Sequence, residues 1–121
     1  MVVRVSNEPT DVEVDRIFQA LADATRRDIV RRVLQREQSV SDLAERYAMS
    51  FAAVQKHVAV LERASLVSKQ RRGREQLVSG NPEALRRAGE LLDQYEQLWR
   101  HRVTRIEGIL ADDQPTSATA Q

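Results

Sequence analysis

The chain is 121 residues long, which suits a single domain with short tails. Its 19 basic and 18 acidic residues nearly cancel, so any attraction to nucleic acid must come from a local basic patch rather than from bulk charge. The absence of cysteine excludes a disulfide framework and a thiolate metal site, and no apolar run approaches the roughly 20 residues that a membrane-spanning helix needs.

Residues 1–10 lack the apolar run of a signal peptide, and we expect them to be the flexible N-terminus of a soluble, cytoplasmic protein. Apolar residues then recur three and four positions apart, which predicts an amphipathic helix over Asp11–Ala22. Asp23 is a good N-cap for a second helix over Ala24–Arg36. Its predicted inner face is Ile29, Val30, Val33 and Leu34. We interpret its arginines as a solvated face paired with nearby acidic residues rather than as DNA contacts; they are Arg26, Arg27, Arg31, Arg32 and Arg36.

Two short helices joined by a tight turn are predicted next. The first covers Ser41–Ala48, with Ser41 as its N-cap, because a serine oxygen can accept a free N–H of the first turn. After the turn, Ser50 caps the second helix. Met49 and Val54 occupy the two positions of a hydrophobic staple, which fixes the angle at which the chain enters that helix.

This second helix has two unlike faces. Its inner stripe recurs at i, i+4, i+7 and i+11 and holds Val54, Val58, Leu61 and Ser65, with His57 at its edge. The other face is small near its N-terminus and carries an amide and an ammonium group. Such a face can approach a groove closely, where Gln bonds adenine, Lys reaches guanine or phosphate, and Ala touches a thymine methyl. We therefore expect it to contact double-stranded DNA through Ser50, Phe51, Ala52, Ala53, Gln55 and Lys56, the alternative being an ordinary amphipathic surface helix.

A β-hairpin is predicted over Leu66–Gly80, because short apolar pairs flank a turn that has glycine where φ must be positive. The turn gathers three arginines, and a lysine stands on one arm. Directly after the second helix, such a hairpin is a wing that can reach along the DNA backbone or into a minor groove. The predicted wing contacts are Lys69, Arg71, Arg72, Gly73 and Arg74. The alternative is a solvent-exposed turn rich in arginine through codon usage.

Asn81 and Pro82 suit the N-cap and first position of a long helix, predicted over about Glu83–Ala111. Its apolar residues keep a spacing of three or four, a narrow seam typical of coiled-coil-like packing. Either the first helix or the same helix of a second copy must cover this seam; packing within one chain alone is the alternative. We expect a homodimer through the N- and C-terminal helices, by way of Ile17, Leu21, Leu92, Tyr95, Trp99, Val103, Ile106 and Leu110. The domain then spans 11–111, and the polar tail 112–121 is expected to be disordered.

The order is therefore helix, helix, helix–turn–helix, two-stranded wing and long helix, a mainly α fold with a β wing. Four motifs accompany it, namely FQALADATRRDIV (Phe18–Val30), SVSDLAERYAMS (Ser39–Ser50), VQKHVAVLERASLV (Val54–Val67) and RRGR (Arg71–Arg74). Together they resemble the ArsR-type family of bacterial winged helix-turn-helix transcriptional regulators, over about Asp15–Leu110. The resemblance implies a homodimer on an inverted-repeat operator, with one recognition helix per subunit in the major groove and the wings on flanking DNA. It also implies repression released by an effector, which the sequence does not identify.

The chain departs from the family pattern at several positions. Ala48 and Ser65 stand where relatives often have glycine, so we expect a strained backbone there. Phe51 and Gln55 replace polar residues of the recognition helix, so the operator cannot be copied from relatives.

We expect neither a metal nor another cofactor. Many relatives sense metals through cysteines near the helix–turn–helix or through paired ligands on the last helix. Here the first segment reads SVSDLAE, and the last helix offers His101 with the amide Gln97 one turn before it. Zinc needs three or four N, S or O ligands in a tetrahedral array. A metal-responsive repressor of the same fold stays open as an alternative.

We also expect no enzyme, because the sequence lacks a nucleophile–base pair, a phosphate-binding glycine loop and a carboxylate dyad. A second alternative is a winged helix that contacts other proteins and has no operator of its own.

Overall fold

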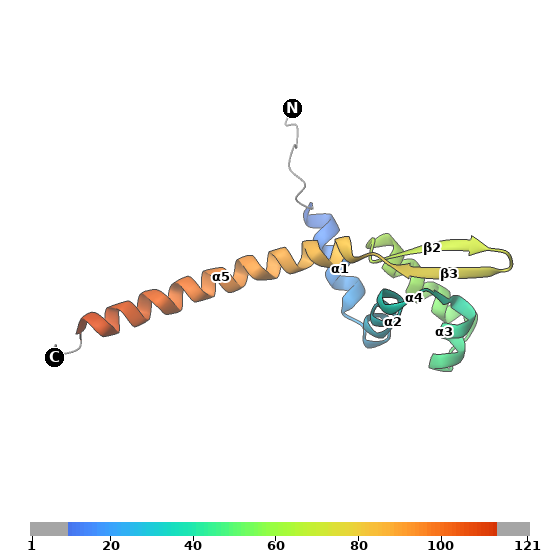
Figure 1. Cartoon of the computed structure of the whole chain (residues 1–121), viewed down its shortest axis with the longest axis horizontal. Helices are drawn as coiled ribbons and strands as arrows, with labels where there is room; N and C mark the ends of the chain where they lie inside the picture. The colour runs from blue at the N-terminus through green and yellow to red at the C-terminus, as the bar shows by residue number, and fades with distance from the viewer. Residues whose placement is uncertain (1–9, 114–121) are drawn as a thin grey trace, which may run out of the picture. The chain divides into compact units, whose positions relative to one another are not determined.

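The computed structural model describes residues 10–113 (Figure 1). The expected flexible N-terminus and tail lie outside these residues, except for Thr10 and the end of the last helix, which runs on to Asp113. The chain divides between Ala88 and Gly89 into two units, each described by itself. The first unit holds α1 (Asp11–Leu21), α2 (Ala24–Gln35), β1 (Gln38–Ser39), α3 (Val40–Tyr47), α4 (Phe51–Arg63), β2 (Val67–Arg72), β3 (Glu75–Gly80) and the first turns of α5 (Pro82–Asp113). The rest of α5 is the second unit. The predicted architecture, mainly α with a hairpin wing, is confirmed.

Side-chain caps set the starts of the first two helices. Thr10 and Glu13 form a capping box at α1, with the Glu13 N–H donating to the Thr10 hydroxyl at 3.2 Å. Asp23 caps α2 as predicted and accepts the N–H of Arg26 at 3.0 Å. This bond holds the pKa of Asp23 below its ordinary value of 3.8.

The start of α3 differs from the prediction. The N-cap is Ser39, whose backbone is extended and whose hydroxyl accepts the N–H of Asp42 at 3.0 Å, whereas Ser41 is an exposed residue inside the helix. The reason lies in the sheet, because Ser39 ends a short strand that the sequence did not reveal. Strand β1 pairs antiparallel with β3, opposite Val78 and Leu77, and the sheet order is β1-β3-β2. Residues 38–39, for which the sequence analysis predicted no strand, therefore form the third strand of the wing sheet.

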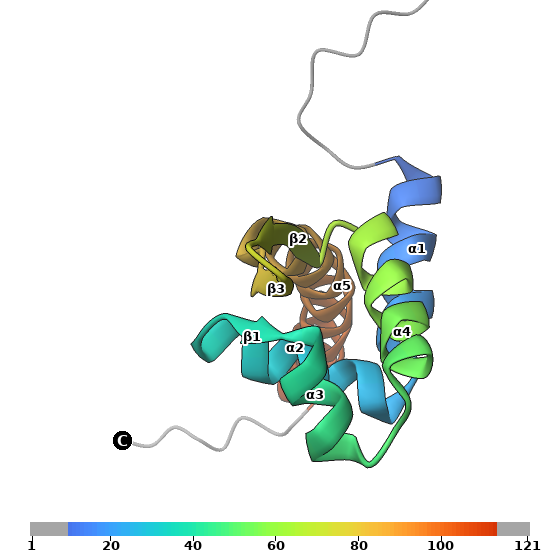
Figure 2. The ribbon, with the colours of Figure 1, turned by 90° about the vertical axis from the view of Figure 1, so that its right-hand side faces the viewer.

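The core of the first unit is aliphatic. Its largest fully buried side chains are Ile29, Leu43, Leu61, Leu66, Val40, Val54, Val58 and Val78. Burying one such side chain contributes about 1.5–3 kcal/mol. Figure 2 shows α4 beside α1, with which it packs, and β1 close to α2 and α3. Leu34, expected on the inner face of α2, is 41% exposed. It lies instead against Gly80, where an added Cβ would come within 2.7 Å of Leu34 Cδ2.

Two arginines at the start of α2 do not form the expected solvated face. Arg26 Nε donates to the carbonyl oxygen of Ala20 at 2.8 Å, and its Nη2 donates to that of Gln19 at 3.1 Å. Arg27 Nη1 donates to the carbonyl oxygen of Leu21 at 2.8 Å. These acceptors are last-turn carbonyls of α1, at the negative end of its dipole, and that of Gln19 also accepts the N–H of the C-cap residue Ala22 at 3.2 Å. Arg26 and Arg27 therefore cap α1 from the neighbouring helix.

The next arginines pair with an acid, as expected, and a tyrosine joins them. Asp28 pairs with Arg31 and accepts from Arg32 Nε at 2.8 Å. It also accepts the hydroxyl of Tyr47, from the end of α3, at 2.5 Å. The Tyr47 hydroxyl, followed by the two guanidinium groups, holds the pKa of Asp28 well below its ordinary 3.8. Burial, followed by the bond to Asp28, raises the pKa of Tyr47 to about 12. One carboxylate thus ties α2 to α3.

We expect Tyr47→Phe to lower the free energy of unfolding by about 1–2 kcal/mol at neutral pH, because it removes a hydrogen bond to a charged acceptor. Since the folded state lowers the pKa of Asp28, this contribution is present above about pH 4 and is lost as the pH falls below it. Urea denaturation followed by circular dichroism across that range measures both effects. The control is Tyr95→Phe on α5, which removes a hydroxyl that has no hydrogen-bond partner among residues 10–113. Equal losses in the two variants, or a loss independent of pH, would contradict the assignment.

Candidate nucleic-acid interface

The turn between α3 and α4 is made without glycine. Ala48 adopts a left-handed conformation with φ of +52°, and the next N–H, that of Met49, returns to the carbonyl oxygen of Ala44 at 3.0 Å. Ser50 then caps α4 as predicted, accepting the N–H of Ala53 at 3.1 Å. A second left-handed residue, Ser65 with φ of +61°, follows α4. Both positions predicted to be strained are in the backbone region that favours glycine.

The two faces of α4 are sharply distinct. Val54, Val58 and Leu61 are fully buried, and they fix which side of the helix meets solvent. Ser65 is exposed rather than part of this stripe, because α4 ends at Arg63. Met49 packs against the core as the staple requires.

The solvent side of α4 holds the residues expected to contact DNA, but not all to the same degree. Phe51 is 46% exposed, and Ser50, Ala52 and Lys56 are also exposed, while Ala53 and Gln55 are less accessible. His57, at the edge of the buried stripe, has its Nδ1 3.3 Å from Arg26 Nη1. It is therefore a hydrogen-bonded structural residue that links α4 to α2.

The wing is a regular hairpin whose tip is basic. Gly73 has φ of +66°, and Arg71, Arg72 and Arg74 around it are all exposed. Arg72 Nη1 lies 3.4 Å from a carboxylate oxygen of Glu37, whose other oxygen accepts the Ser79 hydroxyl at 3.1 Å. Within residues 10–113, Arg74 takes part in no ion pair. An anion such as a phosphate would meet Arg71 and Arg74 without first breaking a salt bridge.

One predicted base-contacting residue is tied to the wing. Gln55 Nε2 donates to Gln76 Oε1 at 2.8 Å, and Lys69 Nζ donates to Gln55 Oε1 at 3.4 Å. The structure thus brings together Gln55 and Lys69, which the sequence assigned to separate elements. Gln76 was missed. Strand alternation places it on the same side of the hairpin as Lys69 and the buried Val78, so the pairing register could have found it.

Residues 21–70 match the family model of a helix-turn-helix domain. The HTH-type transcriptional regulator Rv2034 of Mycobacterium tuberculosis is 36% identical over 90 residues, which cover 74% of this chain and 81% of that protein. The solved structure of an ArsR-like transcriptional regulator from Rhodococcus sp. RHA1 is 31% identical, with a TM-score of 0.70, over 81% of this chain and 92% of the other. This chain belongs to the ArsR family of winged helix-turn-helix transcriptional regulators. A homodimeric winged helix-turn-helix DNA-binding domain from Mycobacterium bovis shares the fold at 20% identity, with a TM-score of 0.58, over 79% of this chain and 95% of the other.

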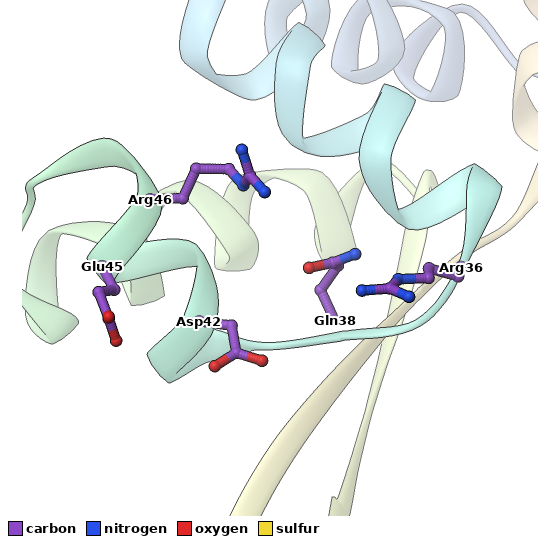
Figure 3. Close-up of a pocket in the computed structure, with 5 residues that line it drawn as sticks. All are labelled: Arg36, Gln38, Asp42, Glu45 and Arg46. Carbon is purple, nitrogen blue, oxygen red and sulfur yellow. The ribbon is translucent and has the colours of Figure 1, made fainter.

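A polar hollow of about 430 Å³ lies beside α3, next to the connection that leaves α2 (Figure 3). It is lined by Arg36, Gln38, Asp42, Glu45 and Arg46. Figure 3 shows the side chains of Arg36 and Gln38 pointing toward each other, with Asp42 and Glu45 directed away from Arg46. Across the described part of the chain, no three His, Cys, Asp or Glu side chains lie close enough together to hold a metal ion. None of the helices found between residues 10 and 113 has the length and apolar character of a membrane span.

The outer part of α5 carries a dense set of exposed apolar side chains. Six of the eight residues assigned to a dimer interface lie on this helix, and five of them are between 45% and 60% exposed, namely Leu92, Tyr95, Trp99, Ile106 and Leu110. Val103 is half-buried, and Leu98 and Ile109, which were not predicted, are 67% and 58% exposed. Ile17, which was also assigned to the interface, is only 3% exposed and belongs to the core of its own chain, so it offers little surface to a second copy. Leu21 is partly buried against the same core.

We expect Ala48→Gly to raise the free energy of unfolding by about 0.5–1 kcal/mol, because glycine adopts the positive φ of this turn without a steric cost. The matched control is Ala59→Gly in the middle of α4, which should lower it by about the same amount. Urea denaturation of the two variants gives opposite signs if the turn is strained. A loss of stability in both would contradict strain at Ala48.

Proposed function

We propose that this ArsR-family chain is a homodimeric repressor that acts in the cytoplasm and binds an inverted-repeat DNA operator. In this proposal α4 enters the major groove, and the wing contacts the phosphate backbone or minor groove beside it. The observation that carries the proposal is the pairing of two exposed surfaces. The first is the small outer face of α4 with its single ammonium, Lys56, and the second is the arginine tip of the adjoining hairpin.

The chemistry of each surface suggests its role. Ala52 and Ala53 let the helix approach base edges closely, Gln55 can bond adenine, and Lys56 can reach guanine or phosphate. Arg71, Arg72 and Arg74 are suited to phosphate oxygens, and Ser50 adds a hydroxyl at the start of α4. Gly73 would let the hairpin tip approach the backbone, since nothing lies within 4 Å of the Cβ it lacks.

The exposed apolar set on α5 supports a homodimer. A lone helix gains most of its stability from the packing of an apolar face, and this one leaves large side chains such as Trp99 and Leu98 in solvent. A second copy would offer the same self-complementary surface, as two-fold dimers require. The homodimeric M. bovis domain is a precedent within the fold. Repression would follow if the bound dimer covered promoter DNA.

Selection of bound sites from random double-stranded DNA tests the proposal directly. An inverted repeat whose half-sites are about one helical turn apart, or a multiple of it, is the expected result. Footprinting on the recovered sequence should protect both half-sites together. Recovery of no enriched sequence would overturn the proposal in favour of a winged helix that contacts proteins.

We expect Arg74→Ala to weaken binding to all DNA sequences by a similar factor, because a phosphate contact carries no base information. The slope of log affinity against log salt should become shallower by about 1 for each phosphate that the variant no longer neutralises. Fluorescence anisotropy titrations at several salt concentrations measure both quantities. Arg16→Ala, an exposed arginine on α1, removes the same charge away from the wing and should leave the slope unchanged. An unaltered slope in Arg74→Ala would exclude a phosphate contact there.

We expect Trp99→Asp to raise the dimer dissociation constant by about 30-fold or more, since a central interface tryptophan is often worth about 2 kcal/mol or more. Gln97→Asp puts the same charge on the same helix, on the side away from the apolar set, and should leave the dimer intact. Sedimentation velocity over a concentration series distinguishes the two variants. If the unaltered chain is a monomer at micromolar concentration, or both variants dissociate equally, the proposed interface is wrong.

A further inference from the structure

The cluster of Gln55, Lys69 and Gln76 has a fixed hydrogen-bond direction. A lysine ammonium has three donors and no acceptor, so the Gln55 atom that faces Lys69 Nζ at 3.4 Å must be the amide oxygen. The Gln55 nitrogen therefore faces Gln76, and Gln76 must present its own oxygen, at 2.8 Å. Hydrogen-bond donation therefore has one direction: Lys69 on β2 donates to Gln55 on α4, and Gln55 donates to Gln76 on β3.

These two hydrogen bonds use only part of the hydrogen-bonding capacity of the Gln55 amide. A glutamine amide has two N–H donors and an oxygen with two lone pairs. Gln76 accepts one donor and Lys69 occupies one lone pair, so one donor and one acceptor remain. Adenine presents the complementary pair in the major groove, an acceptor at N7 and a donor at N6.

We propose that Gln76, on the wing, is a positioning residue for base recognition, which holds the Gln55 amide so that its remaining donor and acceptor read an adenine. The inference rests on the proposed function and deepens it. A free glutamine side chain loses rotamer freedom when it binds, and an amide already held at both ends has less to lose. The wing then affects base discrimination as well as backbone contact.

The register of the hairpin supports this role. Residues that face each other across β2 and β3 share one side, so Lys69 and Val78 lie on the same side as Arg71 and Gln76. Val78 on this side is fully buried, which anchors the hairpin next to α4. Lys69, opposite Val78, and Gln76, in the next pair toward the tip, both reach Gln55 of α4 from that anchored position. The opposite side carries Gln70, which is exposed and supplies a matched glutamine on the neighbouring strand.

The test compares base discrimination in variants of the full chain. Binding is measured by anisotropy on the selected operator and on versions with each base pair replaced in turn. The base pair read by Gln55 is the one at which Gln55→Ala loses discrimination. At that pair we expect Gln76→Ala to lose at least about 5-fold of the discrimination ratio, the lower end of what a bidentate base contact supplies. Its salt slope and its discrimination at other pairs should stay as in the unaltered chain.

Two further variants separate positioning from a general structural role. Gln76→Glu retains an oxygen that can accept from Gln55, so it should keep the discrimination ratio even if its charge weakens all binding. Gln70→Ala, on the other side of the hairpin, should leave the ratio unchanged. In the Gln55→Ala background, Gln76→Ala should cause no further loss, because the two residues act through one amide.

Different outcomes overturn the proposed function and the role of Gln76. If no DNA sequence is enriched, the proposed function falls and this inference falls with it. If an operator is found but Gln55→Ala relaxes no base pair, the inference is overturned while the function stands. The same holds if Gln76→Ala keeps full discrimination, if Gln70→Ala lowers it equally, or if the losses of Gln55→Ala and Gln76→Ala add.

Discussion

Burial of Val54, Val58 and Leu61 fixes the rotation of α4 about its own axis, and the rest of the interface depends on that rotation. Three aliphatic side chains at helical spacing, all without solvent contact, contribute several kcal/mol together and cannot turn outward without losing it. The side opposite them is then committed to solvent. That side is where the chain carries alanines, Phe51 and Lys56, so a packing constraint decides which surface can meet DNA.

Several arginines connect the helices around α4, in addition to those that supply positive charge at the surface. Arg26 reaches the end of α1 and also His57 on α4, so one guanidinium connects three helices. Arg31 and Arg32 converge on Asp28, which receives Tyr47 from α3. Guanidinium groups suit this work because they present several donors in a fixed plane. An aliphatic core with few aromatic residues is thereby joined at its edges by charged hydrogen bonds.

The sequence predicts the features that depend on local spacing and leaves open those that depend on distant partners. The caps Asp23 and Ser50, the turn at Gly73 and the buried stripe of α4 all follow from residues within one or two helical turns. Two serines two positions apart made the start of α3 ambiguous, and only the pairing of β1 with β3 favours Ser39. A two-residue strand is too short to have a visible period.

Contacts between residues far apart in the sequence could not be predicted either, because they also depend on distant partners. Gln55 and Gln76 are 21 positions apart, and their meeting requires the docked hairpin. Ile17 kept the helical period of an interface residue, but the same period also describes a core residue, and α1 packs on α4. Leu34 has the spacing of the inner face of α2, yet the close approach at Gly80 leaves it at the edge.

Partition of the arginines explains how a chain with nearly balanced charge can still present a basic surface. The arginines on α2 bond to backbone carbonyls or to Asp28, and Arg72 forms an ion pair with Glu37. Lys56 and Arg74 enter no ion pair in the described part of the chain, and Arg71 donates only to the Gly73 carbonyl there. These unneutralised groups lie on α4 and at the hairpin tip. Local positive potential therefore arises where basic side chains are left without an ion-pair partner, while Glu37 and Glu75, which faces Arg72 across the hairpin, offset part of the wing's charge.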